Sequence, residues 1–242
     1  MTGEGAAEVE HFGIRLPDRP GLFVGRLREA LIAGRYEAAE RRAALHGLEP
    51  GERVLDLGAG AGFITATLAR APEVESVLAV EPDPRLLPVL EEVLRLNAVA
   101  PKVRLLHGVL LPDPPGATVP FHQRRSFWAS SLDAQMGGVV ATTEVPAHRA
   151  ADLLEEARPT LVVADIEGAE LDLLPVLAEA PSVRRIVVEL HPNLYGEAGL
   201  AAIFRALLDR DFLLDVGAPR ANLVLSFVKL GRGGVVKPAG AV

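Results

Sequence analysis

The sequence predicts an α/β domain built on a mostly parallel sheet of seven strands, with helices on both faces. Short apolar runs alternate with helical patterns from about residue 50 to about residue 210. A glycine-rich turn joins the first apolar run to a helix, as in βα units that bind nucleotide-like ligands. Hydrophobic residues make up 49% of the 242 residues. That content is ample for the core of one such domain.

Charge and composition narrow the class of protein. The formal net charge of −7 disfavours nucleic acid as the main partner, although a local basic patch is compatible with it. The chain has no cysteine, so disulfides and thiolate metal sites are excluded. No run approaches the roughly 18 apolar residues of a membrane span, and the first ten residues are acidic rather than basic and apolar. We therefore expect a cytoplasmic protein without a membrane segment. The oligomeric state, homo-oligomer included, stays open.

The stretch from Arg53 to Phe63, RVLDLGAGAGF, predicts a buried strand, a tight turn and the start of a helix. Gly58, Gly60 and Gly62 lack a Cβ where the backbone must turn sharply and approach a ligand. A second apolar strand ends in Glu81, which lies 19 residues after Gly62. That spacing is close to the one expected of a carboxylate that binds ribose hydroxyls. The alternative is a structural turn with no ligand.

The acid before the glycines indicates which ligand to expect. A dinucleotide site would show the pattern G-x-G-x-x-G, whereas this chain has Asp56-x-Gly58-x-Gly60-x-Gly62. Asp56 would repel a pyrophosphate and suits a cation. S-adenosylmethionine carries an ammonium, a sulfonium and a ribose diol but no phosphate. The run Val54 to Gly62 resembles the first motif of the class I S-adenosylmethionine-dependent methyltransferases. By that resemblance Glu81, with Pro82 beside it, would hold the ribose, and the turn would face the methionine part through Asp56, Gly58, Ala59, Gly60, Gly62 and Phe63.

Segments outside these motifs set the expected domain limits. Residues 1–48 form an arm and a helical extension: a disordered start to about residue 10, a short strand within Val9 to Leu16, and helices from about Leu22 to His46. Arg35, Tyr36, Glu37 and Glu40 could overhang the site, or belong to a solvated helix face. The cofactor-binding domain spans residues 49–230, and residues 231–242 are expected to be a mobile tail.

A third strand is expected over Val103 to Leu111. In the methyltransferase architecture its end at His107 and Gly108 passes near the adenine, and a packing or surface role is the alternative for His107. The β-rich insertion of residues 112–146 follows. Within it, Gln123 to Ser131 combines two arginines and two aromatic residues, which suits either a substrate contact or an ordinary surface hairpin.

Acidic residues end two later strands. The strand from Thr160 ends in Asp165, before the segment IEGAE at residues 166–170, and the strand from Val183 ends in Glu189 and His191. In an open parallel sheet such ends lie at the crevice where ligands bind. The alternative is that Asp165 caps the next helix, with Glu167 and Glu170 favouring its N-terminus.

Taken together, the motifs resemble those of the FkbM family of S-adenosylmethionine-dependent methyltransferases. They are LDLGAG at residues 55–60, VEPD at 80–83, Asn97, DIEGAE at 165–170 and VELH at 188–191. The resemblance covers about residues 35 to 230. It implies a Rossmann-like class I methyltransferase fold and O-methylation of a hydroxyl on a small molecule such as a natural product or a sugar. Many members have a lysine just before the aspartate, where this chain has Ala164.

The expected chemistry is an in-line methyl transfer, for which the enzyme mainly aligns the reactants. A hydroxyl acceptor also needs a base at hydrogen-bonding distance. Asp165 and His191 are the candidates for orienting and deprotonating it, with Glu167 and Glu189 as supports. The same four residues suit a divalent metal, but their spacing does not gather them at one point, so we predict no metal. A nucleic-acid methyltransferase using Arg124 and Arg125, an oxidoreductase that binds NAD or a nucleotide sugar, and a non-catalytic binding module are the alternatives.

Overall fold

A seven-stranded sheet forms the centre of the protein in the computed structural model, which describes residues 7–19, 21–124, 131–132, 137–221 and 223–231. The strand order is β11-β12-β10-β9-β3-β4-β5. Only β12 runs antiparallel to its neighbours in this sheet. This arrangement confirms the predicted mostly parallel sheet. The strands are β3 (Glu52–Leu57), β4 (Val74–Glu81), β5 (Val103–His107), β9 (Leu161–Ala164), β10 (Arg185–Glu189), β11 (Phe212–Leu214) and β12 (Val224–Lys229).

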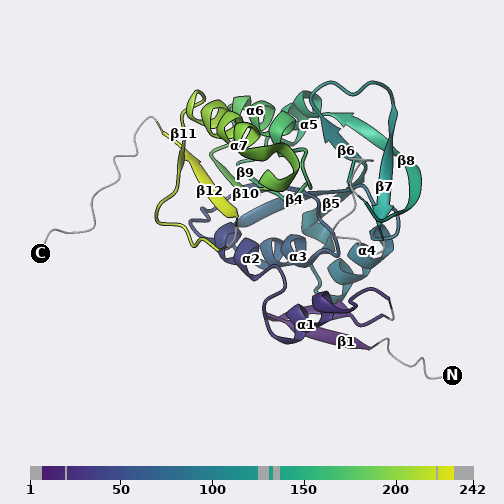
Figure 1. Cartoon of the computed structure of the whole chain (residues 1–242). Coiled ribbons are helices and arrows are strands. Elements are labelled where there is room, and N and C mark those ends of the chain that lie inside the picture. The colour runs from purple at the N-terminus through teal and green to yellow at the C-terminus, as the bar shows by residue number, and fades with distance from the viewer. Residues whose placement is uncertain (1–6, 20, 125–130, 133–136, 222, 232–242) are drawn as a thin grey trace, which may run out of the picture.

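Helices cover both faces of the sheet (Figure 1). On one face lie α2 (Ala38–Leu45), α3 (Phe63–Arg70) and α4 (Leu87–Leu96), and on the other lie α5 (Ala150–Ala157), α6 (Glu170–Glu179) and α7 (Pro192–Leu208). Alternate residues of each strand point to opposite faces, so Val54 packs with the first layer and Leu55 with the second. Because both faces are buried, the central strands read as nearly continuous apolar runs. Within the described ranges, no helix has the length and apolar character needed to cross a bilayer.

The N-terminal segment is a β-hairpin followed by a helix. Strands β1 (Glu8–His11) and β2 (Ile14–Pro17) pair antiparallel, and α1 (Arg26–Ile32) follows. The side chain of Asn97, just after α4, accepts the N–H of Arg15 at 2.9 Å and donates to its carbonyl at 2.8 Å, which fastens the hairpin to the domain. The expected disordered start to about residue 10 is wrong for residues 8–10, because β2 supplies a pairing partner. Residues 1–6 and 232–242 lie outside the described ranges.

The strand expected over Val103 to Leu111 is wrong as a single element. It breaks at Gly108 (φ +135°), where a Cβ would lie 2.4 Å from the carbonyl oxygen of Pro146. Before the break is β5, and after it β6 (Val109–Leu111) joins a second sheet of order β6-β8-β7. The other strands of that sheet are β7 (Thr118–Arg124) and β8 (Val139–Arg149), and a short 3₁₀ helix, η1 (Ala100–Lys102), precedes β5. The β-rich insertion therefore begins at β6 and rejoins the domain at α5.

Candidate functional site

A cavity with an empty volume of about 830 Å³ opens at the carboxyl ends of the central strands. Strand β3 lies between β4 and β9, so its end is where successive βα units depart in opposite directions along the sheet. Ligands of open α/β sheets bind at this kind of position. The lining comes from the glycine turn after β3, the ends of β4 and β9, the start of the insertion, and Glu37 from the N-terminal helical segment.

The glycines of the turn serve different contacts. At Gly58 (φ +78°) a Cβ would lie 1.9 Å from the carbonyl oxygen of Asp165, so only glycine lets β3 and β9 approach this closely. At Gly60 the nearest atom to a Cβ would be 3.9 Å away, and this residue lines the cavity. A Cβ at Gly62 would meet Leu90, so the third glycine permits helix packing. The first two glycines therefore shape the ligand site.

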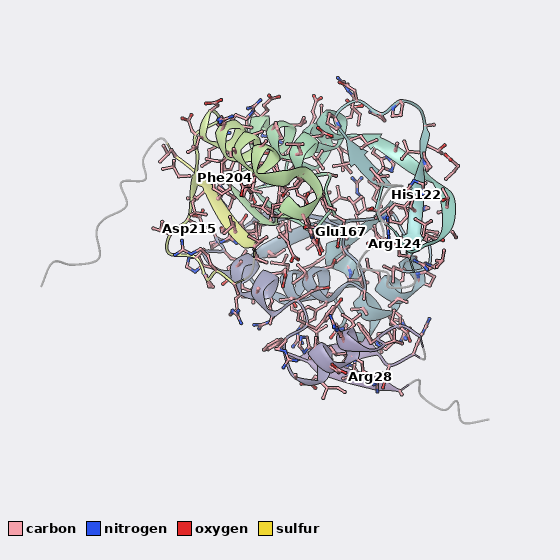
Figure 2. The ribbon with its side chains drawn as sticks, in the orientation of Figure 1. Arg28, His122, Arg124, Glu167, Phe204 and Asp215 are labelled. Atoms are coloured by element: carbon pink, nitrogen blue, oxygen red, sulfur yellow. The ribbon has the colours of Figure 1, made fainter. Side chains whose placement is uncertain are left out.

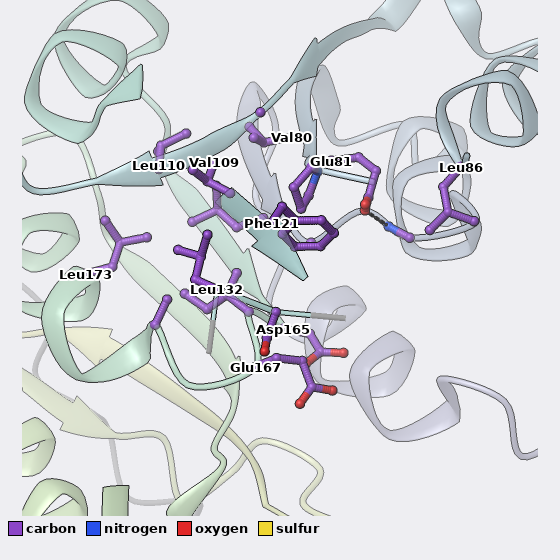
Figure 3. Close-up of a pocket in the computed structure, with 18 of the residues that line it drawn as sticks. Val80, Glu81, Leu86, Val109, Leu110, Phe121, Leu132, Asp165, Glu167 and Leu173 are labelled. Atoms are coloured by element: carbon purple, nitrogen blue, oxygen red, sulfur yellow. Dashed lines mark hydrogen bonds between the residues drawn. The ribbon is translucent and has the colours of Figure 1, made fainter. Parts of the chain in front are cut away.

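Glu81 ends β4 and lines the cavity beside the turn. Its Oε2 accepts the N–H of Gly60 at 2.7 Å, drawn in Figure 3, and its Oε1 accepts the N–H of Asp83 at 2.7 Å. Burial raises the pKa of Glu81 to about 8, although these two hydrogen bonds oppose the shift. Each carboxylate oxygen has a second lone pair, so a ligand with two neighbouring hydroxyls can still bind Glu81.

Two carboxylates and a histidine gather across the cavity from Glu81. Figure 3 shows Asp165 and Glu167 there, both from the loop after β9. Nε2 of His191, which follows β10, lies 3.6 Å from Oδ1 of Asp165 and 3.7 Å from Oε2 of Glu167. Its Nδ1 lies 2.7 Å from Oε1 of Glu170, a side chain with no exposed surface. The fold thus brings the ends of β9 and β10 together as expected.

The electrostatics of this cluster are dominated by acids. Burial and the charges of Glu189 and Glu167 raise the pKa of Asp165 well above its usual range. Burial also raises the pKa of Glu189 to about 7, aided by the charge of Glu40. Burial alone would lower the pKa of His191, but its hydrogen bond to Glu170 and the charges of the acids around it raise that pKa to about 9. The site therefore favours a bound cation.

The insertion supplies an apolar wall. Val109 and Leu110 of β6, Phe121 of β7, and Leu132 line the cavity (Figure 3). The insertion is fixed to β4 because Nε2 of Gln123 donates to Oδ1 of Asp83 at 3.0 Å. Residues 125–130, which hold the two aromatics and Arg125 of the expected substrate-binding segment, lie outside the described residues.

The structure places the predicted residues in two groups. Those that line the cavity are Gly58, Gly60, Glu81, Pro82, Gly108, Asp165 and Glu167. His191 borders it through its contacts with Asp165 and Glu167. Glu189 lies beside the same acids, one of the charges that raise the pKa of Asp165.

The remaining predicted residues do not line this cavity. Asp56 is buried and accepts a hydrogen bond from the hydroxyl of Thr65 in α3. Nε2 of His107 is 3.1 Å from the carbonyl oxygen of Pro82, and His107 is not among the residues that line the cavity. Ala59, Gly62 and Phe63 are held in the packing around α3.

Three contributors to the site lie outside the predicted catalytic and cofactor-binding residues, although Glu37 is among those expected as possible overhanging groups. The sequence indicates Glu170 only as a member of the DIEGAE motif that favours a helix N-terminus, yet in the structure it holds His191. Glu37 lines the cavity from the N-terminal segment, and Phe121 lines it from the insertion. From the sequence, Glu37 could either overhang the site or lie on a solvated helix face. No sequence pattern pointed to Phe121.

Comparison with known proteins connects this geometry to a family. The Methyltransferase FkbM domain matches residues 56–214. No curated protein matches the sequence significantly. Among solved structures, the FkbM methyltransferase of Methylobacillus flagellatus has a TM-score of 0.53 and 18% identity, over 77% of this chain and 46% of that chain. This chain therefore spans about half the length of that protein.

Two further structures have lower TM-scores. The precorrin-6y C5,15-methyltransferase of Geobacter metallireducens gives 0.48 at 13% identity, over 81% of this chain and 89% of that one. Trm5b of Pyrococcus abyssi has a TM-score of 0.49 and 17% identity, over 93% of this chain and 55% of that chain. At 18% identity, the likeness to the Methylobacillus flagellatus structure reports on the fold alone. The domain match, which covers well over half of the sequence, shows that the chain belongs to the FkbM family of methyltransferases.

Proposed function

We propose that this chain is an S-adenosylmethionine-dependent methyltransferase that methylates a hydroxyl group of a small molecule. The observation that carries the proposal is the shared cavity: Glu81, the glycine turn and the pair Asp165 and Glu167 all line it.

The residues present fit this cofactor. Glu81 keeps one lone pair on each oxygen for a ribose diol, and Gly60 leaves the adjoining space free of a side chain. Val80, Pro82 and Leu86 supply an apolar wall near Glu81 that suits a purine ring. The acidic character of the cavity as a whole suits a cofactor that carries positive charge. When bound, S-adenosylmethionine would supply a methyl group on a carbon already activated by the sulfonium.

The chain's own residues would then align the acceptor and take its proton. A hydroxyl that enters beside Asp165 has a base within reach, because the raised pKa of Asp165 makes its carboxylate a stronger base than an ordinary aspartate. His191 would help to orient the hydroxyl. Phe121 and Leu132 cover the cavity from the insertion and would keep water from the reacting atoms. Proton removal and water exclusion would both use groups that already line or border the cavity.

A nucleic-acid acceptor has less support in this structure. The side chain of Arg124 is buried in the insertion, where its Nη1 donates to Oγ of Ser131 at 3.0 Å. Figure 2 labels Arg124 on the insertion and Arg28 on the N-terminal segment. A buried arginine held in this way is not available to a phosphate backbone.

The test measures cofactor binding first and acceptor chemistry second. We expect calorimetry to detect S-adenosylhomocysteine binding to the wild-type chain and a loss of at least 10-fold in affinity for Glu81→Ala, since the variant loses two hydrogen bonds to the ribose, each worth about 1 kcal/mol. Glu75→Ala is the matched control, an exposed glutamate on the same strand. No binding by the wild-type chain would remove the proposal. Candidate acceptors would then be screened by mass spectrometry for the gain of one methylene unit.

A further inference from the structure

One group of side chains at the cavity has the composition and spacing of a metal site. Asp165, Glu167 and His191 each offer one ligand atom, and these atoms all lie within 4.8 Å of one another. Metal–oxygen bonds of about 2.1–2.2 Å place neighbouring ligand atoms about 3 Å apart and opposite ones about 4.3 Å apart. The observed separations of 3.6 and 3.7 Å from Nε2 of His191 to the two carboxylates lie between these two values. Small side-chain rotations would bring all three atoms onto one ion.

His191 is held in the orientation of a metal-binding histidine. Its Nδ1 bonds to Oε1 of Glu170, which directs Nε2 toward Asp165 and Glu167. A carboxylate that accepts the other ring N–H fixes the tautomer and the ring direction of metal-bound histidines. The backbone N–H of His191 also donates to the hydroxyl of Tyr195 at 2.8 Å, so the main chain is anchored as well. The Nε2 lone pair is therefore presented to the space between the carboxylates.

Unpartnered oxygens give an independent indication. Among the described residues, the buried Oδ1 of Asp165 has no hydrogen-bond partner, and neither has Oε2 of Glu170, whose side chain has no exposed surface. Buried polar atoms are nearly always satisfied, and a buried carboxylate oxygen without a donor is unfavourable. A cation next to Asp165 would supply the missing interaction there. The negative charges of Glu189 and Glu40 also favour a cation beside Asp165.

We propose that Asp165, Glu167 and His191 bind a divalent cation of the Mn²⁺ or Mg²⁺ class, with Glu170 as the positioning residue behind His191. Two carboxylates and one imidazole suit Mn²⁺ in particular, which prefers oxygen and accepts nitrogen. Two of the ligands line the cavity, so the ion would lie beside the acceptor hydroxyl and make it more acidic. That role rests on the proposed methyl transfer, whereas ion binding itself does not.

The test uses the full chain, dialysed against a chelator and titrated with Mn²⁺, followed by electron paramagnetic resonance and calorimetry. We expect one Mn²⁺ per chain. Asp165→Asn and His191→Gln should each weaken binding by at least 10-fold, and Glu170→Gln by about 10-fold or more because the histidine loses its anchor. Asp152→Asn, an exposed aspartate on α5, should bind as the wild type does. Circular dichroism confirms that each variant is folded.

The outcomes separate the ion site from the cofactor site. Absence of Mn²⁺ binding, or binding that Asp165→Asn and His191→Gln leave unchanged, would overturn the proposal. Competition between Mn²⁺ and S-adenosylhomocysteine would overturn it too, since the cluster would then be the site of the cofactor's ammonium group. Mn²⁺ binding by a wild-type chain that fails to bind S-adenosylhomocysteine would support the ion site while contradicting the proposed function.

Discussion

Glu170 and His191 form a hydrogen-bonded pair: Nδ1 of the partly buried imidazole lies 2.7 Å from Oε1 of a carboxylate that has no exposed surface. The glutamate begins α6 and the histidine follows β10, so the pair joins two successive βα units behind the cavity. The carboxylate itself does not line the cavity. Its effect on chemistry must therefore pass through the position of the imidazole.

Replacing that carboxylate should separate catalysis from cofactor binding. For Glu170→Gln we expect kcat to fall about 10–100-fold, which is the usual effect of losing such a supporting partner. The affinity for S-adenosylhomocysteine should stay within about two-fold, because Glu81 and the glycine turn are untouched. Nitrogen-15 NMR of the His191 ring would show a change in tautomer population that a purely structural role would not produce. Glu179→Gln, an exposed residue at the end of the same helix, is the control. An unchanged kcat would contradict the positioning role.

The burial of Glu81 should make stability depend on pH in a defined direction. Burial raises its pKa from 4.5 to about 8. Between about pH 5 and pH 8 the folded chain keeps a proton that the unfolded chain releases, so this residue lowers the free energy of unfolding as the pH rises. Glu81→Gln removes that dependence. The Tm of the variant relative to that of the wild type should therefore increase by several degrees when the pH is raised from about 5.5 to about 8.5.

Calorimetric scans of both proteins at the two pH values measure this difference. The buried Asp56, whose pKa burial raises to about 6, acts in the same direction but is present in both proteins and cancels. Glu75→Gln, on the same strand but exposed, should show no such gain. A Tm difference that does not change with pH would show that Glu81 is already ionised in the folded chain at low pH.

Two glycines of one turn should respond differently to the same substitution. Gly58→Ala would place a Cβ 1.9 Å from the carbonyl oxygen of Asp165, so β3 and the loop after β9 must separate. We expect an unfolded or strongly destabilised chain. Gly60→Ala meets no atom within 3.9 Å and keeps only the left-handed backbone strain of φ +56°, about 1–2 kcal/mol.

The useful variant of this pair is therefore Gly60→Ala. Its methyl group would project into space that the ligand needs, because Gly60 lines the cavity. We expect a Tm loss of a few degrees but at least a 10-fold loss of S-adenosylhomocysteine affinity, measured by scanning and titration calorimetry. Equal affinity in Gly60→Ala and the wild type would mean that the cofactor does not approach this turn.

The sequence predicted what depends on local patterns. Alternating apolar runs, the glycine turn, Glu81 at a strand end and Asp165 at another follow from spacing and from the geometry of parallel sheets. The break at Gly108 was not predictable, because its cause is the carbonyl oxygen of Pro146, which β8 brings there from a distant part of the chain. The sequence predicts a ligand contact for Asp56, whereas in the structure its side chain accepts a hydrogen bond from Thr65. This pairing could not be predicted because it forms only when α3 packs against β3.

The link between the insertion and the cofactor strand provides the last prediction. Gln123 of β7 donates to Asp83, and the N–H of Asp83 donates to Glu81. Gln123→Leu keeps a similar volume but loses the donor, which is worth about 1 kcal/mol. Because Asp83 keeps its ion pair with Arg85, the chain should stay folded, with S-adenosylhomocysteine affinity reduced about 2–5-fold by calorimetry. His122→Leu, the preceding residue, whose ring contacts Thr142 rather than Asp83, should bind normally. If both variants bind as the wild type does, the insertion does not help to hold Glu81 in place.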